Sequence, residues 1–233
     1  MRGLRAQAIT FDAKDPSMPI RLATQSIGDA LVASLRERIL TDQISVGAPL
    51  TEASVSTDYD VARQTAKAAI ERLVGEGLLE RTAHRSARVP ELDEARVRDL
   101  YFARGVVEVR AYQLLAKRRL LTEEVGRAHK VFRAAASGTD VASIVQTDVE
   151  FHRALIDSLE SERLSRAHRL IINENRLCLA QVQNAHLLGP EEITREHEGI
   201  LAAIRDGDPL RAGELGQQHL EHAERKLLTH LQG

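Results

Sequence analysis

Residues 61–80, VARQTAKAAIERLVGEGLLE, combine a helix with its own stop signal, and this pairing constrains the fold more than any other stretch. The apolar residues recur at intervals of three and four, so they share one stripe of a helix: Ala66, Ala69, Ile70, Leu73 and Val74. Gly75 and Gly77 end the helix because glycine adopts the left-handed cap conformation without steric strain. Leu78 and Leu79 then begin an extended run. The stretch predicts an amphipathic helix followed by a strand.

The polar residues near the start of this predicted helix suit contact with DNA. Arg63, Gln64 and Lys67 fall away from the apolar stripe. In a major groove, Arg or Lys can donate to guanine acceptors, and Gln can pair with adenine. The same side chains would equally suit a helix face that meets only solvent. The choice between these two interpretations depends on the segments that precede the stretch.

Two helical segments precede it at the spacing of a helix-turn-helix. Residues 27–40 carry an apolar stripe with one residue per turn: Ile27, Leu31, Leu35 and Ile39. Thr51 can cap a short second helix, because its hydroxyl can accept from the backbone N–H groups of the first turn. Residues 58–60 then make a turn. This order favours a recognition helix over a solvated one and predicts that residues 78–80 form the first strand of a wing.

At this point the chain resembles the N-terminal domain of GntR-type bacterial transcription regulators, over residues 27–89. The matching blocks are LRERILTDQISVGAPLTEASVS, VARQTAKAAIERLVGEGLLER and RSARV. The resemblance implies a winged helix-turn-helix in which Arg63 and Lys67 contact DNA. The chain departs from the family at Ala62, where a serine usually caps the recognition helix, and at Ala68, where a glutamate is common.

The predicted wing is also unusual for the family. It reads TAHRSARV in place of a glycine-rich tip, and Arg81, His84 and Arg85 make it basic. Basic side chains there suit contact with the DNA backbone or minor groove, although a solvated hairpin would look similar. We expect these three residues to belong to the DNA-binding surface.

Length and composition place limits on the class of protein. The 233 residues, 43% of them hydrophobic, suffice for two domains. A net charge of −2 argues against a protein that coats nucleic acid uniformly. The single cysteine, Cys178, fits a reducing compartment, and no apolar run approaches the length of a membrane span. We therefore expect a cytoplasmic protein with a mobile tail over residues 1–25, a DNA-binding domain over 26–90 and a second domain over 91–233.

After Pro90 the sequence carries only helical periodicity. Six segments are predicted, at residues 93–119, 122–136, 140–159, 162–186, 190–207 and 208–230. Such a run of consecutive helices favours an antiparallel bundle. The predicted fold class is therefore mainly α, with a winged helix-turn-helix followed by an antiparallel helical bundle.

Histidines dominate the chemistry of the predicted bundle. Asp148 and His152 are four residues apart and share a helix face that continues into the core. Their burial would be unfavourable unless a partner such as a divalent metal satisfied them. His197 and His219 also fall on inward stripes, and His222 is the rival to His219. A hydrogen-bonded Asp–His pair with unrelated histidines explains the spacing equally well.

A second resemblance covers residues 93–230, which are similar to the all-helical effector domain of the FadR subfamily of GntR regulators. The blocks are RGVVEVRAYQLLAKR, DVEFHRALIDSLES and EHEGILAAIRDGDPLRAGELGQQHL. The resemblance implies a metal site with four ligands: Asp148, His152, His197 and His219. Three imidazoles and one carboxylate suit zinc, nickel or another borderline divalent ion. The metal can be purely structural or can take part in binding an effector.

These resemblances lead to a functional prediction. We expect a dimeric regulator that binds a palindromic operator and responds to a small organic acid held by the metal and Arg104. An i, i+4 ion pair with Glu108 is the alternative role for Arg104. The rival class is a metal-dependent enzyme that uses two of the histidines and Asp148 as an iron centre. Because no nucleophile motif, phosphate loop or general base accompanies the cluster, we expect no enzymatic activity.

Overall fold

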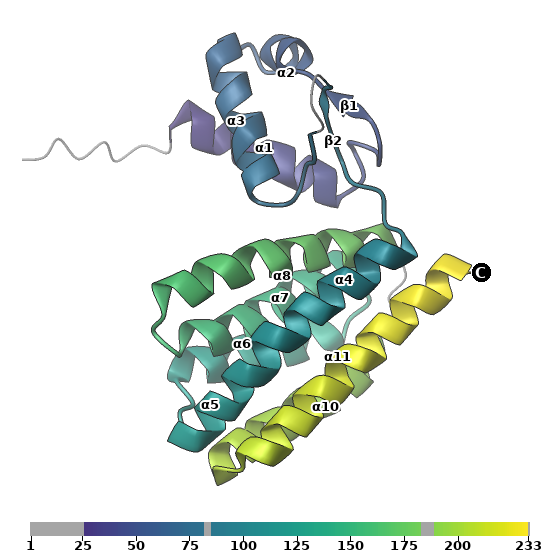
Figure 1. The fold of residues 1–233 in the computed structure, drawn as a ribbon. Helices are drawn as coiled ribbons and strands as arrows, with labels where there is room; N and C mark the ends of the chain where they lie inside the picture. The colour runs from purple at the N-terminus through teal and green to yellow at the C-terminus, as the bar shows by residue number, and fades with distance from the viewer. Residues whose placement is uncertain (1–25, 82–84, 183–188, 233) are drawn as a thin grey trace, which may run out of the picture.

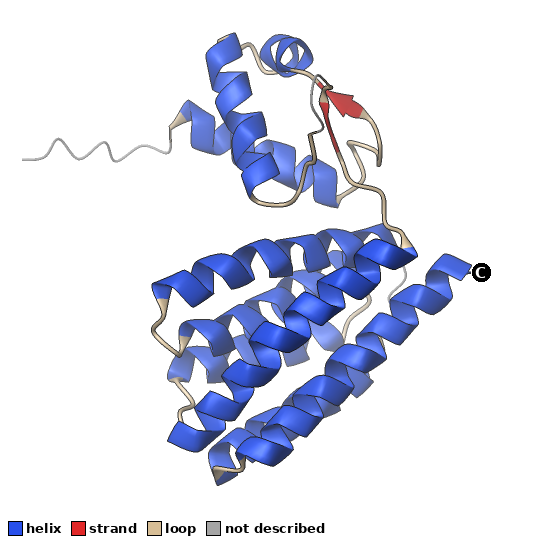
Figure 2. Ribbon diagram, in the orientation of Figure 1, coloured by secondary structure: helices blue, strands red, loops and turns tan. Residues whose placement is uncertain are grey.

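A computed structural model describes residues 26–81, 85–182 and 189–232, which pack as a small N-terminal unit and a larger helical unit (Figure 1). Helices build most of both units, and the strands described are short segments of the N-terminal one (Figure 2). The predicted fold class is confirmed: the protein is mainly α, with a winged helix-turn-helix followed by an antiparallel helical bundle. The tail expected over residues 1–25 lies outside the described residues.

The N-terminal unit contains the three predicted helices, α1 (Ile27–Leu40), α2 (Glu52–Asp58) and α3 (Arg63–Gly75). Thr51 caps α2 as predicted, and its side chain forms a reciprocal capping box with Ser54. Ala62 stands at the N-cap of α3 and contributes no side-chain hydrogen bond. The recognition helix therefore begins without the capping side chain that is usual in the family.

The wing differs from its prediction. The strand pair that forms joins β1 (Pro49–Leu50) to β2 (Ala87–Arg88) in antiparallel register, while the predicted strand at residues 78–80 is reduced to a single bridge between Glu80 and Arg88. Leu78 and Leu79 are both buried, at 1% and 2% exposure, so they lack the alternating faces of a strand. Their N–H groups both reach back to the Leu73 carbonyl and complete the end of α3.

The six helical segments predicted after Pro90 are present, except that residues 183–186 of the fourth lie outside the described residues. Their described bounds are α4 (Glu94–Arg104), η1 (Gly105–Val109), α5 (Arg110–Arg118), α6 (Glu123–Ala136), α7 (Val141–Asp157), α8 (Glu162–Val182), α10 (Pro190–Asp206) and α11 (Pro209–Gln232). The first predicted segment is one rod whose centre, η1, is a single π-helical stretch. Within the described ranges, none of the helices has the length and apolar character needed to cross a membrane.

Helix α8 joins the two units. It lies on the side of the bundle that faces the N-terminal unit (Figure 1). Its Leu177, 4% exposed, belongs to the hydrophobic core of the N-terminal unit, together with residues of α1 and α3. Gln181 donates to the Pro90 carbonyl, and the side chain of Glu174 lies against Gly77 at the end of α3. The N-terminal unit thus packs on the bundle mainly through α8, and Arg96 of α4 adds an ion pair to Glu80 at 2.7 Å.

Candidate metal and ligand site

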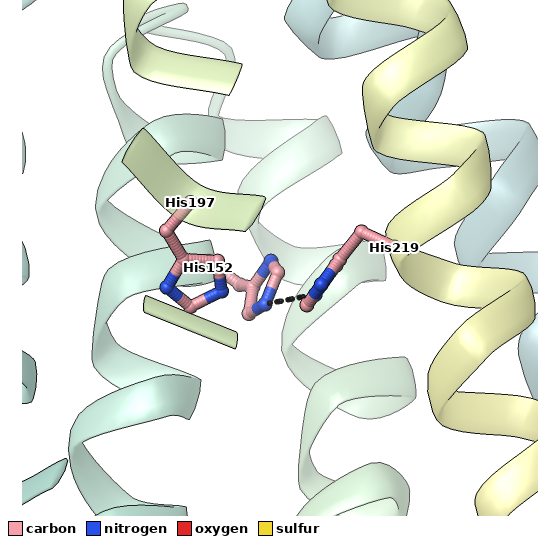
Figure 3. A group of neighbouring side chains, drawn as sticks. All are labelled: His152, His197 and His219. Carbon is pink, nitrogen blue, oxygen red and sulfur yellow. Dashed lines mark hydrogen bonds between the residues drawn. The ribbon is translucent and has the colours of Figure 1, made fainter. Parts of the chain in front are cut away.

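Three buried histidines from three helices meet in the centre of the bundle. His152 of α7, His197 of α10 and His219 of α11 are each at most 3% exposed, and their candidate ligand nitrogens lie within 4.8 Å of one another. Figure 3 shows the three imidazole rings converging, with His152 and His219 facing each other. The Nε2 atoms of these two rings are 3.3 Å apart. Two nitrogens bound to one ion at about 2.1 Å would be separated by about 3.0–3.4 Å.

Asp148 adds a carboxylate to this cluster. It lies one turn before His152 on α7, and its Oδ1 is 3.7 Å from His152 Nε2 and 3.5 Å from His197 Nε2. That Oδ1 atom and both ring nitrogens of His197 are buried and make no hydrogen bond among the described residues. Orphaned acceptors of this kind are unfavourable unless a cation or a donor satisfies them. The donor set therefore fits a divalent metal ion.

Two other carboxylates fix the orientation of the histidine rings. Glu108 lies 3.0 Å from His152 Nδ1, and Glu196 lies 2.7 Å from His219 Nδ1. An ionised carboxylate only accepts hydrogen bonds, so each Nδ1 carries the proton. Nε2 is then the nitrogen through which each ring can bind an ion at the centre of the cluster. Metal-binding histidines are commonly oriented by such a second carboxylate.

The charges around the cluster favour a positive centre. Burial alone would lower the pKa of His152, but the Glu108 and Asp148 carboxylates raise that pKa to about 9. Burial lowers the pKa of His197 well below its ordinary value, and it also lowers the pKa of His219. The cluster therefore holds one cationic imidazole beside two neutral ones, and a metal ion would replace that proton with a larger positive charge.

The structure groups His219, and not its rival His222, with the other two histidines. His222 donates through Nδ1 to Glu196 at 2.6 Å, and its Nε2 lies 3.4 Å from Glu192. These contacts hold His222 at the rim, with 22% of its side chain exposed. The two histidines differ because a spacing of three residues turns them to different sides of Glu196.

A pocket of about 600 Å³, measured with its open mouth, lies next to the cluster. Arg104 lines this pocket and is 1% exposed. Its Nε is 2.7 Å from Glu108, so the predicted i, i+4 ion pair is present, and a second nitrogen donates to Asn175. The pocket lining also includes Tyr101, whose hydroxyl, like Asn175 Nδ2, makes no hydrogen bond within the described residues. These polar groups are buried in a lining that is otherwise mostly apolar.

The predicted DNA-binding residues lie on the surface. Arg63 and Gln64 are exposed in the first turn of α3, and the side chain of Lys67, 45% exposed, follows one turn later. Arg81 and Arg85 are exposed on either side of the wing tip. His84 lies outside the described residues. Exposure at these positions is what contact with DNA would require.

Sequence reasoning missed the groups that organise the centre. Glu196 adjoins His197 in the sequence, yet nothing in the pattern indicates that it accepts from His219. Buried His168 also contacts Glu108, at 3.2 Å. The one usable signal was the position of Glu108 one turn after Arg104, which indicated an ion pair but not its contact with His152.

The chain can now be compared with known proteins. The family model described as bacterial regulatory proteins, gntR family, matches residues 27–89, and that of the FCD domain matches residues 99–222. A relative described as "Probable D-xylose utilization operon transcriptional repressor", from Paenarthrobacter nicotinovorans, is 25% identical over 203 residues, which cover 87% of each chain. The transcriptional repressor RspR of Escherichia coli K12 is 25% identical over 205 residues, covering 85% of this chain and 87% of RspR.

A solved structure supports the same assignment. A GntR transcriptional regulator from Rhodococcus sp. RHA1 is 26% identical and matches with a TM-score of 0.75, covering 87% of this chain and 97% of its own. The fold agrees with these matches, and both relatives are described as transcriptional repressors. This chain belongs to the gntR family of bacterial regulatory proteins, and its helical unit is an FCD domain.

Proposed function

We propose that this regulator binds a palindromic operator as a dimer, and that a small organic acid changes its operator affinity through a metal site in the FCD domain. The observation that carries the proposal is the convergence of three buried imidazoles beside a pocket that a buried arginine lines. The domain boundaries that go with it are a DNA-binding domain over residues 26–90 and an effector-binding domain over 91–233.

Four residues would hold the metal: Asp148, His152, His197 and His219. Three nitrogens and one oxygen suit zinc or nickel, and they leave room for an exchangeable ligand when the ion accepts a fifth or sixth donor. The bound ion would supply a fixed positive charge that a carboxylate can join. The protein supplies the orientation of each ring, through Glu108 and Glu196.

The wall of the pocket supports an anionic effector. Within the described part of the chain, three of the five N–H groups of Arg104 are engaged, two by Glu108 and one by Asn175. The two that remain, with the unpaired Tyr101 hydroxyl and Asn175 amide, make a group of donors on one side of the pocket. A small carboxylate offers the several acceptors and the negative charge that this group needs.

Helix α8 gives the pocket a route to the recognition helix. Asn175 faces the pocket, and Leu177, two residues later, is packed in the core of the DNA-binding unit. A ligand that moves Asn175 would therefore also move Leu177, and with it the position of α3 relative to the bundle. A coupling of about 1–3 kcal/mol would change operator affinity about 5- to 150-fold.

An apolar patch supports dimer formation. Phe102 and Val106 are one turn apart on α4 and η1 and are 72% and 60% exposed. Leu170 of α8, the helix that packs against α4, is 44% exposed. A two-fold axis would set this patch against itself in a second copy. The same axis would place two recognition helices on half-sites about one helical turn apart.

Selection of genomic fragments by the purified, metal-loaded protein tests the proposal. We expect enrichment of an inverted repeat, and a change in its affinity when a matching organic acid is added. Arg63→Ala should weaken binding to that repeat. Arg127→Ala, which removes an equally exposed charge from α6, should not. Recovery of fragments without sequence preference at moderate salt, or turnover of the acid with no effect on DNA binding, would contradict the proposal.

A further inference from the structure

Glu108 is the most heavily engaged side chain of the bundle. It is fully buried, and its carboxylate accepts from four side chains: Arg104, Tyr112, His152 and His168. One oxygen, Oε1, takes Arg104 Nε at 2.7 Å and His168 Nε2 at 3.2 Å. The other, Oε2, accepts from Tyr112 Oη at 2.8 Å and lies 3.0 Å from His152 Nδ1, which is itself 2.8 Å from Tyr112 Oη.

The π-helical stretch η1 explains how one rod can supply this arrangement. Arg104, Glu108 and Tyr112 follow one another at intervals of four residues. In a regular α-helix, intervals of four drift around the axis, because a turn contains 3.6 residues. The wider turn of η1 compensates for this drift and keeps all three side chains directed inward. Single π-helical turns often occur at functional sites for this reason.

Glu108 remains ionised despite its burial. Burial alone would raise its pKa, but the charge of Arg104 and the contacts with His152 hold the pKa well below its ordinary value. The carboxylate can therefore only accept hydrogen bonds, and every neighbouring group must donate to it. His152 Nδ1 therefore faces the carboxylate and the Tyr112 hydroxyl, and Nε2 is the nitrogen left for an ion.

We propose that Glu108 is a positioning residue for metal binding, which keeps the proton of His152 on Nδ1 and directs its Nε2 to the ion. The inference rests on the proposed metal site. Arg104 neutralises the same carboxylate from the pocket side, so the metal ligand and the candidate effector contact share one acceptor. Neither the family match nor the proposed ligand set assigns this role to Glu108.

Replacement of the carboxylate by an amide separates positioning from packing. Glu108→Gln keeps the shape of the side chain but adds an N–H₂ donor. When that donor faces His152, it favours a ring that accepts through Nδ1 and carries its proton on Nε2, where the proton blocks the metal. Tyr112 Oη, 2.8 Å from Nδ1, is the other group that this nitrogen can contact. His168→Gln is the matched control, because it also disturbs a buried contact of Glu108 but leaves the His152 contact intact.

Competition between the full-length protein and a chromophoric chelator for Zn²⁺ measures the effect directly. Outer carboxylates of this kind are worth 10- to 100-fold in metal affinity, so Glu108→Gln should weaken zinc binding by about that factor. His168→Gln should fall well short of it. Thermal unfolding of the chelator-treated proteins gives the metal-free stability of each variant. The loss of zinc affinity in Glu108→Gln should exceed what its loss of stability explains.

The outcomes separate the inference from the proposed site. A wild-type chain that binds no Zn²⁺ would overturn the proposed metal site itself. Wild-type affinity in Glu108→Gln, or equal losses in Glu108→Gln and His168→Gln, would overturn the positioning role alone. If Glu108→Gln does not fold, Glu108→Asp decides, because its shorter side chain keeps the charge but cannot hold the 3.0 Å contact with His152. Unchanged zinc affinity in that variant would also refute the role.

Discussion

Truncation of Leu177 should loosen the DNA-binding unit although the residue lies in the FCD domain. Leu177 is 4% exposed and packs in the core that α1 and α3 share. Leu177→Ala removes the equivalent of three methylene groups, which at about 0.8 kcal/mol each amounts to about 2.4 kcal/mol. A partly relaxed cavity raises the expected loss to about 3 kcal/mol. This loss corresponds to a factor of about 150 in the opening equilibrium of the unit.

Hydrogen–deuterium exchange read by mass spectrometry can localise this loss. Peptides from residues 27–80 should lose protection by up to that factor, while peptides from α6 and α10 should keep theirs. Leu210→Ala is the control, because Leu210 of α11 is 77% exposed and should change stability by less than about 0.5 kcal/mol. Equal loss of protection in both units, or none in the DNA-binding unit, would refute the assignment of Leu177 to its core.

Three further predictions concern the linkage and the cluster. Gly77→Ala should lower the melting temperature more than Gly47→Ala, because both glycines have positive φ but only Gly77 faces another side chain. His219→Asn should abolish zinc binding in a chelator competition, and His222→Asn should retain it. In metal-free protein, the stability that His152 contributes is present below its unfolded pKa of 6.5 and is lost as pH rises through about 9. Urea unfolding between these pH values should show the decline, and His152→Gln should flatten it.

Periodicity and capping were enough to predict most of the fold. The stripe of α3, the Thr51 cap and most bounds of the bundle helices follow from local side-chain chemistry, which acts within a few residues. In the predicted stripe of α1, Leu31, Leu35 and Ile39 are buried, but Ile27 is 72% exposed. The start of the first wing strand was mispredicted, because Leu78 and Leu79 are β-compatible residues that the end of α3 draws into the core; pairing begins at Glu80. Pairing between Pro49 and Arg88 joins segments 39 residues apart, and no local pattern encodes it.

In the candidate site, too, local contacts could be predicted from the sequence and contacts between distant segments could not. Asp148 and His152 could be paired because one helix turn separates them. His197 and His219 were candidates from their inward stripes, and the family resemblance joined all four into one ligand set. The contacts of Glu108 with His152 and of Glu196 with His219 depend on how whole helices cross. The π-helical turn that aims Glu108 inward has no signature in the letters GVVEV. The carboxylates that orient the metal-binding histidines are therefore the part of such a site that sequence patterns reveal least.

The position of Leu177 bears on how such regulators could exchange parts during evolution. Recombination at the linker would give a new DNA-binding unit a foreign effector domain, and with it a foreign side chain in the middle of its own core. A shuffled protein would fold well only if the incoming α8 carried an apolar residue of similar volume at that point. We therefore expect functional chimaeras to need the segment from Glu174 to Gln181 to travel with the winged helix.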